Sequence, residues 1–110
     1  MKRRRPSYDI ELARRLAIAG ETVLTKRVRH YLIERRHTNL SDITVGVFTN
    51  MRREHFHKAV ELDKRPGTYA DVYKGIEYDD IEWYVKFFID ESDVMTLNIW
   101  SMCDVDDDWH

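Results

Sequence analysis

The side chains best suited to chemistry lie in two short stretches of the 110-residue sequence. The first stretch contains Arg52, His55 and Lys58, and the second contains Tyr84 and Lys86. Imidazole, ammonium and phenol groups can transfer a proton or hold fixed charge beside a reacting atom. Cleavage of RNA by in-line attack of the 2′-hydroxyl needs a base, an acid and a cation for the charge that develops on the phosphoryl oxygens, and it needs no metal. These residue types therefore fit metal-independent cleavage of RNA.

The first stretch also has a purely structural interpretation. A helix over 51–62 would place His55 on an apolar arc, where its ring would be a hydrogen-bonded core histidine. His57 would point to solvent on the opposite side. Lys58 would lie at the edge of the arc, where it either extends its ammonium to solvent or supplies positive charge to a nearby site. Both interpretations of Lys58 stay open from the sequence.

The formal net charge of −2 conceals a strong asymmetry between the two halves of the chain. Residues 1–58 carry 14 Lys and Arg against 6 Asp and Glu, whereas residues 59–110 carry 4 against 14. Either the halves neutralise each other in the fold, or the basic half forms a binding surface. A basic surface beside exposed aromatic rings is typical of single-strand recognition. The residues expected to bind RNA are Lys86, Arg52, Arg29, Arg35 and Trp100.

Composition excludes several classes of protein. Cys103 is the single cysteine, so the chain forms no internal disulfide and no cysteine-based zinc site. The histidines at 55 and 57 diverge on a helix, and the acidic run after Cys103 lacks the glycine and glutamate of an EF-hand, so we expect neither a metal nor a cofactor. No apolar run reaches the ~20 residues of a membrane span and no signal peptide is visible. We expect one cytoplasmic domain over 1–110 that does not associate with membranes.

Periodicity and turn residues predict the order of the elements. Ser7 is the expected N-cap of the first helix and Gly20 its C-terminal stop, while Thr22 or Thr25 can start the second helix. The predicted segments, in order, are a flexible lead-in over 1–6, a helix over 8–19, a basic second helix, a strand or irregular core segment over 43–48, a helix over 51–62, a short strand over 68–73, strands over 81–90 and 94–103, and an acidic tail over 104–110.

The last two strands form the clearest predicted unit, an antiparallel hairpin. A four-residue loop pairs Ile89 with Val94, and a five-residue loop pairs Ile89 with Met95. The second register gathers the aliphatic side chains on one face. We prefer this register because burial of apolar area, at ~25 cal/mol per Å², is the larger contribution to the choice between the two. It leaves a partly polar face that carries Tyr84 and Lys86. The fold class is therefore α+β, with the helices of the N-terminal half packed on one face of an antiparallel sheet.

Several segments, read together, resemble the MqsR family of bacterial toxin endoribonucleases. They are the "LARRLAIAG" run that ends at Gly20, "HFHKAV" around Lys58, "YADVY" over 69–73, "WYVKF" over 83–87 and "DVMTLNIWSM" over 93–102. The resemblance implies a RelE-like α+β fold and a toxin that cleaves mRNA. It also implies a cognate antitoxin protein as partner.

The resemblance carries family residues onto this chain only in part. Lys58 and Tyr84 match family positions implicated in cleavage, and we expect them, with His55, to be catalytic. The family's glutamine falls on Ala70, and its C-terminal lysine either falls on Trp100 or is lost in a shifted register. The alternative is therefore a noncatalytic module on the same fold that binds RNA or forms a homodimer. A further hypothesis is that the acidic tail masks the basic helices.

Overall fold

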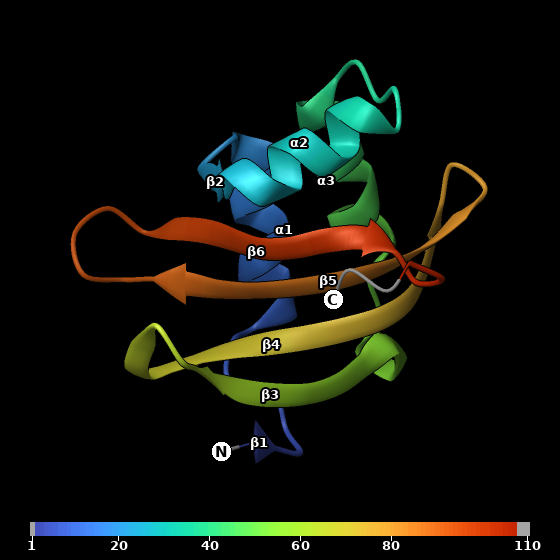
Figure 1. The fold of residues 1–110 in the computed structure, drawn as a ribbon. Coiled ribbons are helices and arrows are strands. Elements are labelled where there is room, and N and C mark those ends of the chain that lie inside the picture. Colours follow the sequence, from blue (N-terminus) through green and yellow to red (C-terminus); the bar gives the residue numbers. More distant parts are fainter. Residues whose placement is uncertain (1, 108–110) are drawn as a thin grey trace.

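The computed structural model describes residues 2–107, which form a six-stranded sheet and three α-helices (Figure 1). The elements, in chain order, are β1 (Lys2–Arg3), α1 (Ile10–Ala19), β2 (Thr22–Leu24), α2 (Lys26–Glu34), α3 (Leu40–Asn50), the 3₁₀ turn η1 (Arg53–His55), β3 (Phe56–Leu62), β4 (Arg65–Tyr78), β5 (Ile81–Asp90) and β6 (Thr96–Asp104).

The sheet has the strand order β1-β3-β4-β5-β6-β2. Strands β3 to β6 form an antiparallel meander, β1 adds to it at one edge, and β2 lies parallel to β6 at the other. The predicted α+β fold with an antiparallel sheet is confirmed for β1 and the meander β3 to β6, and β2 alone departs from it. After α1 the chain runs beside β6, where the Leu97 N–H donates to the Glu21 carbonyl at 2.9 Å, so β2 joins in parallel.

The helices do not all cover one face of the sheet. Helices α1 and α3 pack behind the sheet in Figure 1, whereas α2 lies along the edge formed by β6 and β2. We name the sheet face opposite α1 and α3 the outer face; among the helices of residues 2–107, α2 alone reaches it, at the β6 edge. The side chains of the outer face include Lys58, Ala70, Val72, Tyr84, Lys86, Phe88, Trp100 and Ser101.

Short polar side chains set the helix starts. The predicted N-cap of α1 is wrong by two residues, because Asp9 caps the helix by accepting from the Glu11 N–H at 3.0 Å. The left-handed stop at Gly20 is confirmed by a φ of 76°. Thr25 caps α2, and its hydroxyl accepts from the Val28 N–H at 3.3 Å.

The predicted strand over 43–48 is wrong, because this segment belongs to α3. Its β-branched residues alternate with others in sequence, but Ile43 and Val47 are four apart and both are buried in the core. Gly46 allows the Tyr78 ring to lie directly on the helix, since an added Cβ would stand 2.1 Å from that ring. Burial on the helical spacing outweighs strand propensity here.

The predicted helix over 51–62 is also wrong. The Arg52 guanidinium binds the Thr49 carbonyl at 3.0 Å and closes the end of α3, after which the chain passes through η1 into β3. Strand β3 pairs with β1 on one side and with β4 on the other. Lys58 therefore lies on a strand and not on a helix rim.

The predicted hairpin is confirmed in its elements but not in its register. Ile89 pairs with Leu97, two residues beyond the predicted partner Met95. The Asp90 carboxylate accepts from the Ser92 N–H and hydroxyl, which shapes the loop over 91–95. A bulge between the Phe87–Ile99 pair and the Lys86–Ser101 pair places Trp100 and Ser101 on the outer face together.

Candidate functional site

A row of four cross-strand neighbours crosses the outer face. Lys58 on β3 pairs with Val72 on β4, Val72 pairs with Lys86 on β5, and Lys86 pairs with Ser101 on β6. Side chains that pair directly across a ladder share one face of a sheet. The register therefore places both lysines on the outer face, with the buried Val72 between them.

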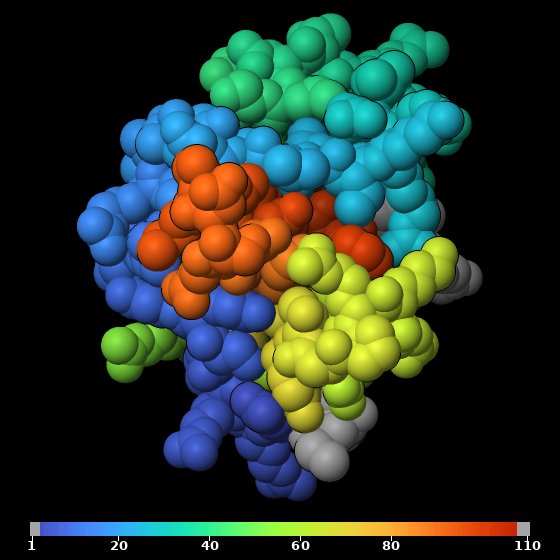
Figure 2. All heavy atoms as spheres, turned by 90° about the vertical axis from the view of Figure 1, so that its left-hand side faces the viewer, coloured from blue at the N-terminus to red at the C-terminus, as the bar shows by residue number. Residues whose placement is uncertain are grey.

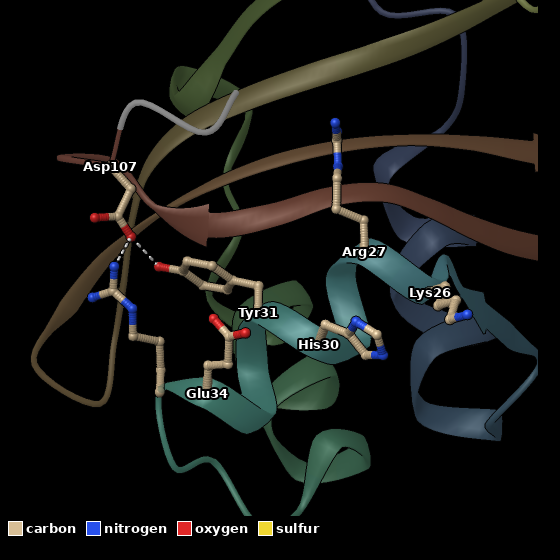
Figure 3. A pocket seen from close by; sticks show the side chains of 7 residues that line it. Lys26, Arg27, His30, Tyr31, Glu34 and Asp107 are labelled. Atoms are coloured by element: carbon tan, nitrogen blue, oxygen red, sulfur yellow. Dashed lines mark hydrogen bonds and ion pairs between the residues drawn. The ribbon is translucent and has the colours of Figure 1, made fainter.

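Helix α2 adds a third cation to this row. Val28 and Leu32 are fully buried and fix the rotation of the helix, so the neighbouring Arg27 faces the sheet. The Arg27 guanidinium donates to Ser101 Oγ at 3.1 Å. Figure 3 shows Arg27 extending from α2 across β6, away from Lys26.

Lys86 lies in a strongly cationic environment. Partial burial is the main reason that its pKa falls below the ordinary value, and the positive charges of Arg27 and Lys58 lower it further, against the opposite effect of Asp63. Within residues 2–107, no hydrogen bond or ion pair reaches the Lys86 ammonium. A half-buried cation next to other cations is a favourable position for an anionic ligand.

Arg27 and Lys86 line a groove of about 360 Å³, which we name the sheet groove. Figure 2 shows its surroundings: the orange-red atoms of β6 lie between the light-blue atoms of α2 and the yellow atoms of the β3–β4 turn. The lining residues are Thr25, Arg27, Glu61, Leu62, Asp63, Lys64, Lys86 and Trp100.

Aromatic surface is available at the same groove. The Trp100 indole is partly exposed and packs on the Phe88 ring, with the ring centroids 6.0 Å apart. Beneath it, Leu62, Ala70 and Phe88 form a small buried apolar cluster. Ala70 thus belongs to the floor and offers no polar group to a ligand.

Tyr84 lies on the outer face but is covered. It is two residues from Lys86 along β5, only 7% exposed, and it does not line the sheet groove. Burial raises the pKa of its phenol, as does Cys103, while Arg27 lowers it. The phenol is therefore neutral near pH 7 and can donate a proton, but neither Lys58 nor Tyr84 lines the sheet groove.

Two of the predicted site residues lie away from the groove, at the junction of α3 and β3. His55 Nδ1 accepts from the Arg52 N–H at 2.9 Å, which leaves the neutral ring's proton on Nε2. The Arg52 side chain binds the carbonyls of Thr49 and Met51. Both residues have structural partners here, and neither lines the sheet groove.

The other two predicted cations lie on α2. Arg29 is exposed, whereas Arg35 forms an ion pair with Asp107 at 2.7 Å. Arg35 belongs to a second groove, of about 880 Å³, which we name the helix groove (Figure 3). The residues that line it are Lys26, Arg27, His30, Tyr31, Glu34, Arg35 and Asp107.

The geometry alone does not identify the protein family to which the chain belongs, but a comparison with known families does. The family model described as "Motility quorum-sensing regulator, toxin of MqsA" matches residues 5–99. The chain belongs to the MqsR toxin family. It is therefore a toxin of a toxin–antitoxin pair, and the family implies an antitoxin as its partner. A search of curated proteins gives no match.

The described part of this MqsR-family chain, residues 2–107, lacks two further features. No helix in this range has the length and apolar character of a membrane span. Within the same range, no three His, Cys, Asp or Glu side chains form a group that could hold a metal ion.

Sequence reasoning did not single out two residues that meet at the sheet groove of this MqsR-family chain, nor a third that holds the entry to α1. Arg27 and Ser101 meet only because of the β6 bulge, which no sequence pattern marks. Asp71, in "YADVY", is fully buried and accepts hydrogen bonds from the Ser7 and Tyr8 N–H groups at 2.8 to 3.0 Å. An acidic residue inside an apolar strand was the available signal, since a buried carboxylate needs partners.

Proposed function

We propose that this MqsR-family toxin is an endoribonuclease that cleaves mRNA in the sheet groove. The observation that carries the proposal is the meeting of Arg27 and Lys86 at one groove, with Lys58 in the same row of the sheet. Guanidinium and ammonium groups are the usual partners of phosphate oxygens. The scissile phosphodiester lies over these cations, and an adjacent base stacks on Trp100.

The proposed reaction is transfer of the phosphoryl group to the neighbouring 2′-hydroxyl. The 2′-oxygen forms a bond to phosphorus and the bond to the 5′-oxygen breaks, giving a 2′,3′-cyclic phosphate and a 5′-hydroxyl. Negative charge grows on the equatorial oxygens, where Lys86 and Arg27 stabilise it. Asp63, which lines the groove, accepts the proton of the 2′-hydroxyl, and the neutral phenol of Tyr84, two residues from Lys86 along β5, donates a proton to the departing 5′-oxygen.

The test is incubation of the purified protein with single-stranded RNA in excess EDTA, followed by analysis of the product ends. We expect cleavage that leaves cyclic phosphate and 5′-hydroxyl ends. A matched oligonucleotide with 2′-deoxy nucleotides should stay intact. No cleavage of RNA at any pH, or cleavage of the deoxy strand at the same rate, would overturn the proposal.

A second candidate, an RNA-binding module without turnover, is favoured by the burial of Tyr84 and by the apolar role of Ala70. It predicts binding of RNA that weakens with added salt, without products. If the wild-type protein cleaves RNA and Tyr84→Phe binds RNA equally well but does not cleave it, this candidate is excluded. Such a result would assign the cleavage to a side chain of this protein. Homodimer formation through the outer face remains a prediction of this candidate alone.

A further inference from the structure

In the helix groove, two donors converge on one carboxylate oxygen. The Tyr31 hydroxyl donates to Asp107 Oδ2 at 2.5 Å, and the Arg35 guanidinium donates to the same oxygen at 2.7 Å (Figure 3). The Tyr31 oxygen also accepts from the Asp104 N–H at 2.9 Å, which directs its proton toward Asp107. The chain therefore holds an anion at this point by oriented donors.

Packing fixes the position of the Tyr31 donor. The Tyr31 side chain is only 8% exposed and belongs to the hydrophobic core, and the Arg35 guanidinium lies 5.1 Å from the centre of its ring. Burial, followed by the hydrogen bond to Asp107, raises the pKa of Tyr31 to about 12. The phenol consequently remains a neutral donor across the physiological range.

The helix groove has more volume and more cationic side chains than are required to bind the single carboxylate of Asp107. Lys26, Arg27 and His30 also line it, and Glu34 is the other acid among its lining residues. Its volume of about 880 Å³ leaves room for a nucleotide unit beside the donors. Arg27 lines both grooves, so the two grooves lie next to each other along α2.

We propose that the helix groove is a second phosphate-binding site for the RNA strand, and that the Asp107 carboxylate occupies it when RNA is absent. This inference rests on the proposed function, because it extends the RNA path beyond the sheet groove. Carboxylate and phosphate oxygens accept the same charge-assisted hydrogen bonds, and an arginine beside a hydroxyl donor suits either. Release of Asp107 lets a backbone phosphate take its place between Tyr31 and Arg35.

The test compares Asp107→Asn with Asp106→Asn in the full chain. Asp106 is exposed, and both changes remove one negative charge from the same turn. Binding of a fluorescent 2′-O-methyl RNA strand, which cannot be cleaved, is measured by anisotropy across a salt series. Asp107→Asn should bind several-fold more tightly at each salt concentration, because its carboxylate no longer competes with the phosphate, whereas its slope of log affinity against log salt should stay at the wild-type value because the number of phosphate contacts is the same. Asp106→Asn should show a much smaller gain in affinity.

A second pair of variants keeps the test decisive if Asp107→Asn does not fold. Arg35→Ala should weaken RNA binding and reduce the salt slope, whereas Arg15→Ala, an exposed arginine on α1, should not. Equal affinities for the Asp107 and Asp106 variants, or equal affinities and slopes for the Arg35 and Arg15 variants, would overturn the second site. If the wild-type protein cleaves RNA while these pairs behave alike, this inference alone fails; if it neither binds nor cleaves RNA, the proposed function fails as well.

Discussion

Arg27 and Ser101 form the contact that joins helix α2 to the outer face of the sheet. The guanidinium donates to Ser101 Oγ at 3.1 Å, and Ser101 is the direct cross-strand partner of Lys86. Arg27 on α2 is thereby held beside Lys86 on β5, and no acidic side chain lies between them in the cross-strand row. This arrangement predicts that the two side chains act on one phosphate.

Arg27→Lys should weaken RNA binding although the charge is kept. An ammonium lacks the planar set of donors with which Arg27 can hold Ser101 and a phosphate together. We expect a Kd about tenfold higher, equivalent to ~1.4 kcal/mol. Filter binding of the uncleavable strand checks this. Wild-type affinity in Arg27→Lys would show that only the charge of residue 27 counts.

Trp100→Ala should weaken binding by loss of stacking. Alanine substitution of a stacking aromatic costs about 1–3 kcal/mol per base. The slope of affinity against salt should stay at the wild-type value, because the indole neutralises no phosphate. Trp100→Phe serves as the control and should retain most of the affinity. A change in slope without a change in affinity would place Trp100 outside the path of the bases.

The pH dependence of RNA binding should reveal Lys86. Its pKa is lowered by burial and then by Arg27 and Lys58, and only the charged ammonium attracts phosphate. Affinity should therefore fall as pH rises through this lowered pKa, before ordinary surface lysines titrate. Lys86→Arg stays charged and should remove that fall. The same depressed pKa means that the ammonium form disfavours folding, so the free energy of unfolding rises as pH increases from the pKa in the folded protein toward the ordinary lysine pKa of 10.5. A wild-type RNA affinity that does not change with pH would contradict the role of Lys86 in RNA binding.

Asp71→Ala should destabilise the fold without touching the groove. The change leaves the Ser7 and Tyr8 N–H groups without their acceptor, at a cost of about 1–3 kcal/mol. Urea unfolding measures the loss, and Asp93→Ala in the exposed β5–β6 loop is the control, expected within about 0.5 kcal/mol of wild type. Equal stability of the two variants would mean that Asp71 does not hold the entry to α1.

The parts of the fold that could be predicted are those in which pattern and burial agree. The alternation over 81–90 has aliphatic side chains on one face only, so it specified β5 and its outer residues. Over 51–62 apolar residues happen to recur at helical spacing, but pairing with β1 and β4 on both sides selects a strand. Because Lys58 was placed on the wrong element, its row with Lys86 could not be foreseen.

The sequence predicted which types of residue form the site, but not which of them contact one another. Lys86 and Trp100 follow from strand alternation. The meeting of Arg27 with Ser101 depends on a bulge of one residue, and the burial of Tyr84 depends on packing from outside its own strand; neither leaves a periodic signal in the sequence.

The central claim is that Lys86 stabilises the scissile phosphate, and the most direct measurement is the single-turnover rate of RNA cleavage by Lys86→Ala beside Lys74→Ala. Lys74 is an exposed lysine on neighbouring β4 and does not line the sheet groove. Removal of a group that stabilises transition-state charge typically costs about 100-fold to 1,000-fold in rate. We expect a loss of that size for Lys86→Ala and a wild-type rate for Lys74→Ala, with both proteins folded. Equal rates for the two variants would contradict the central claim.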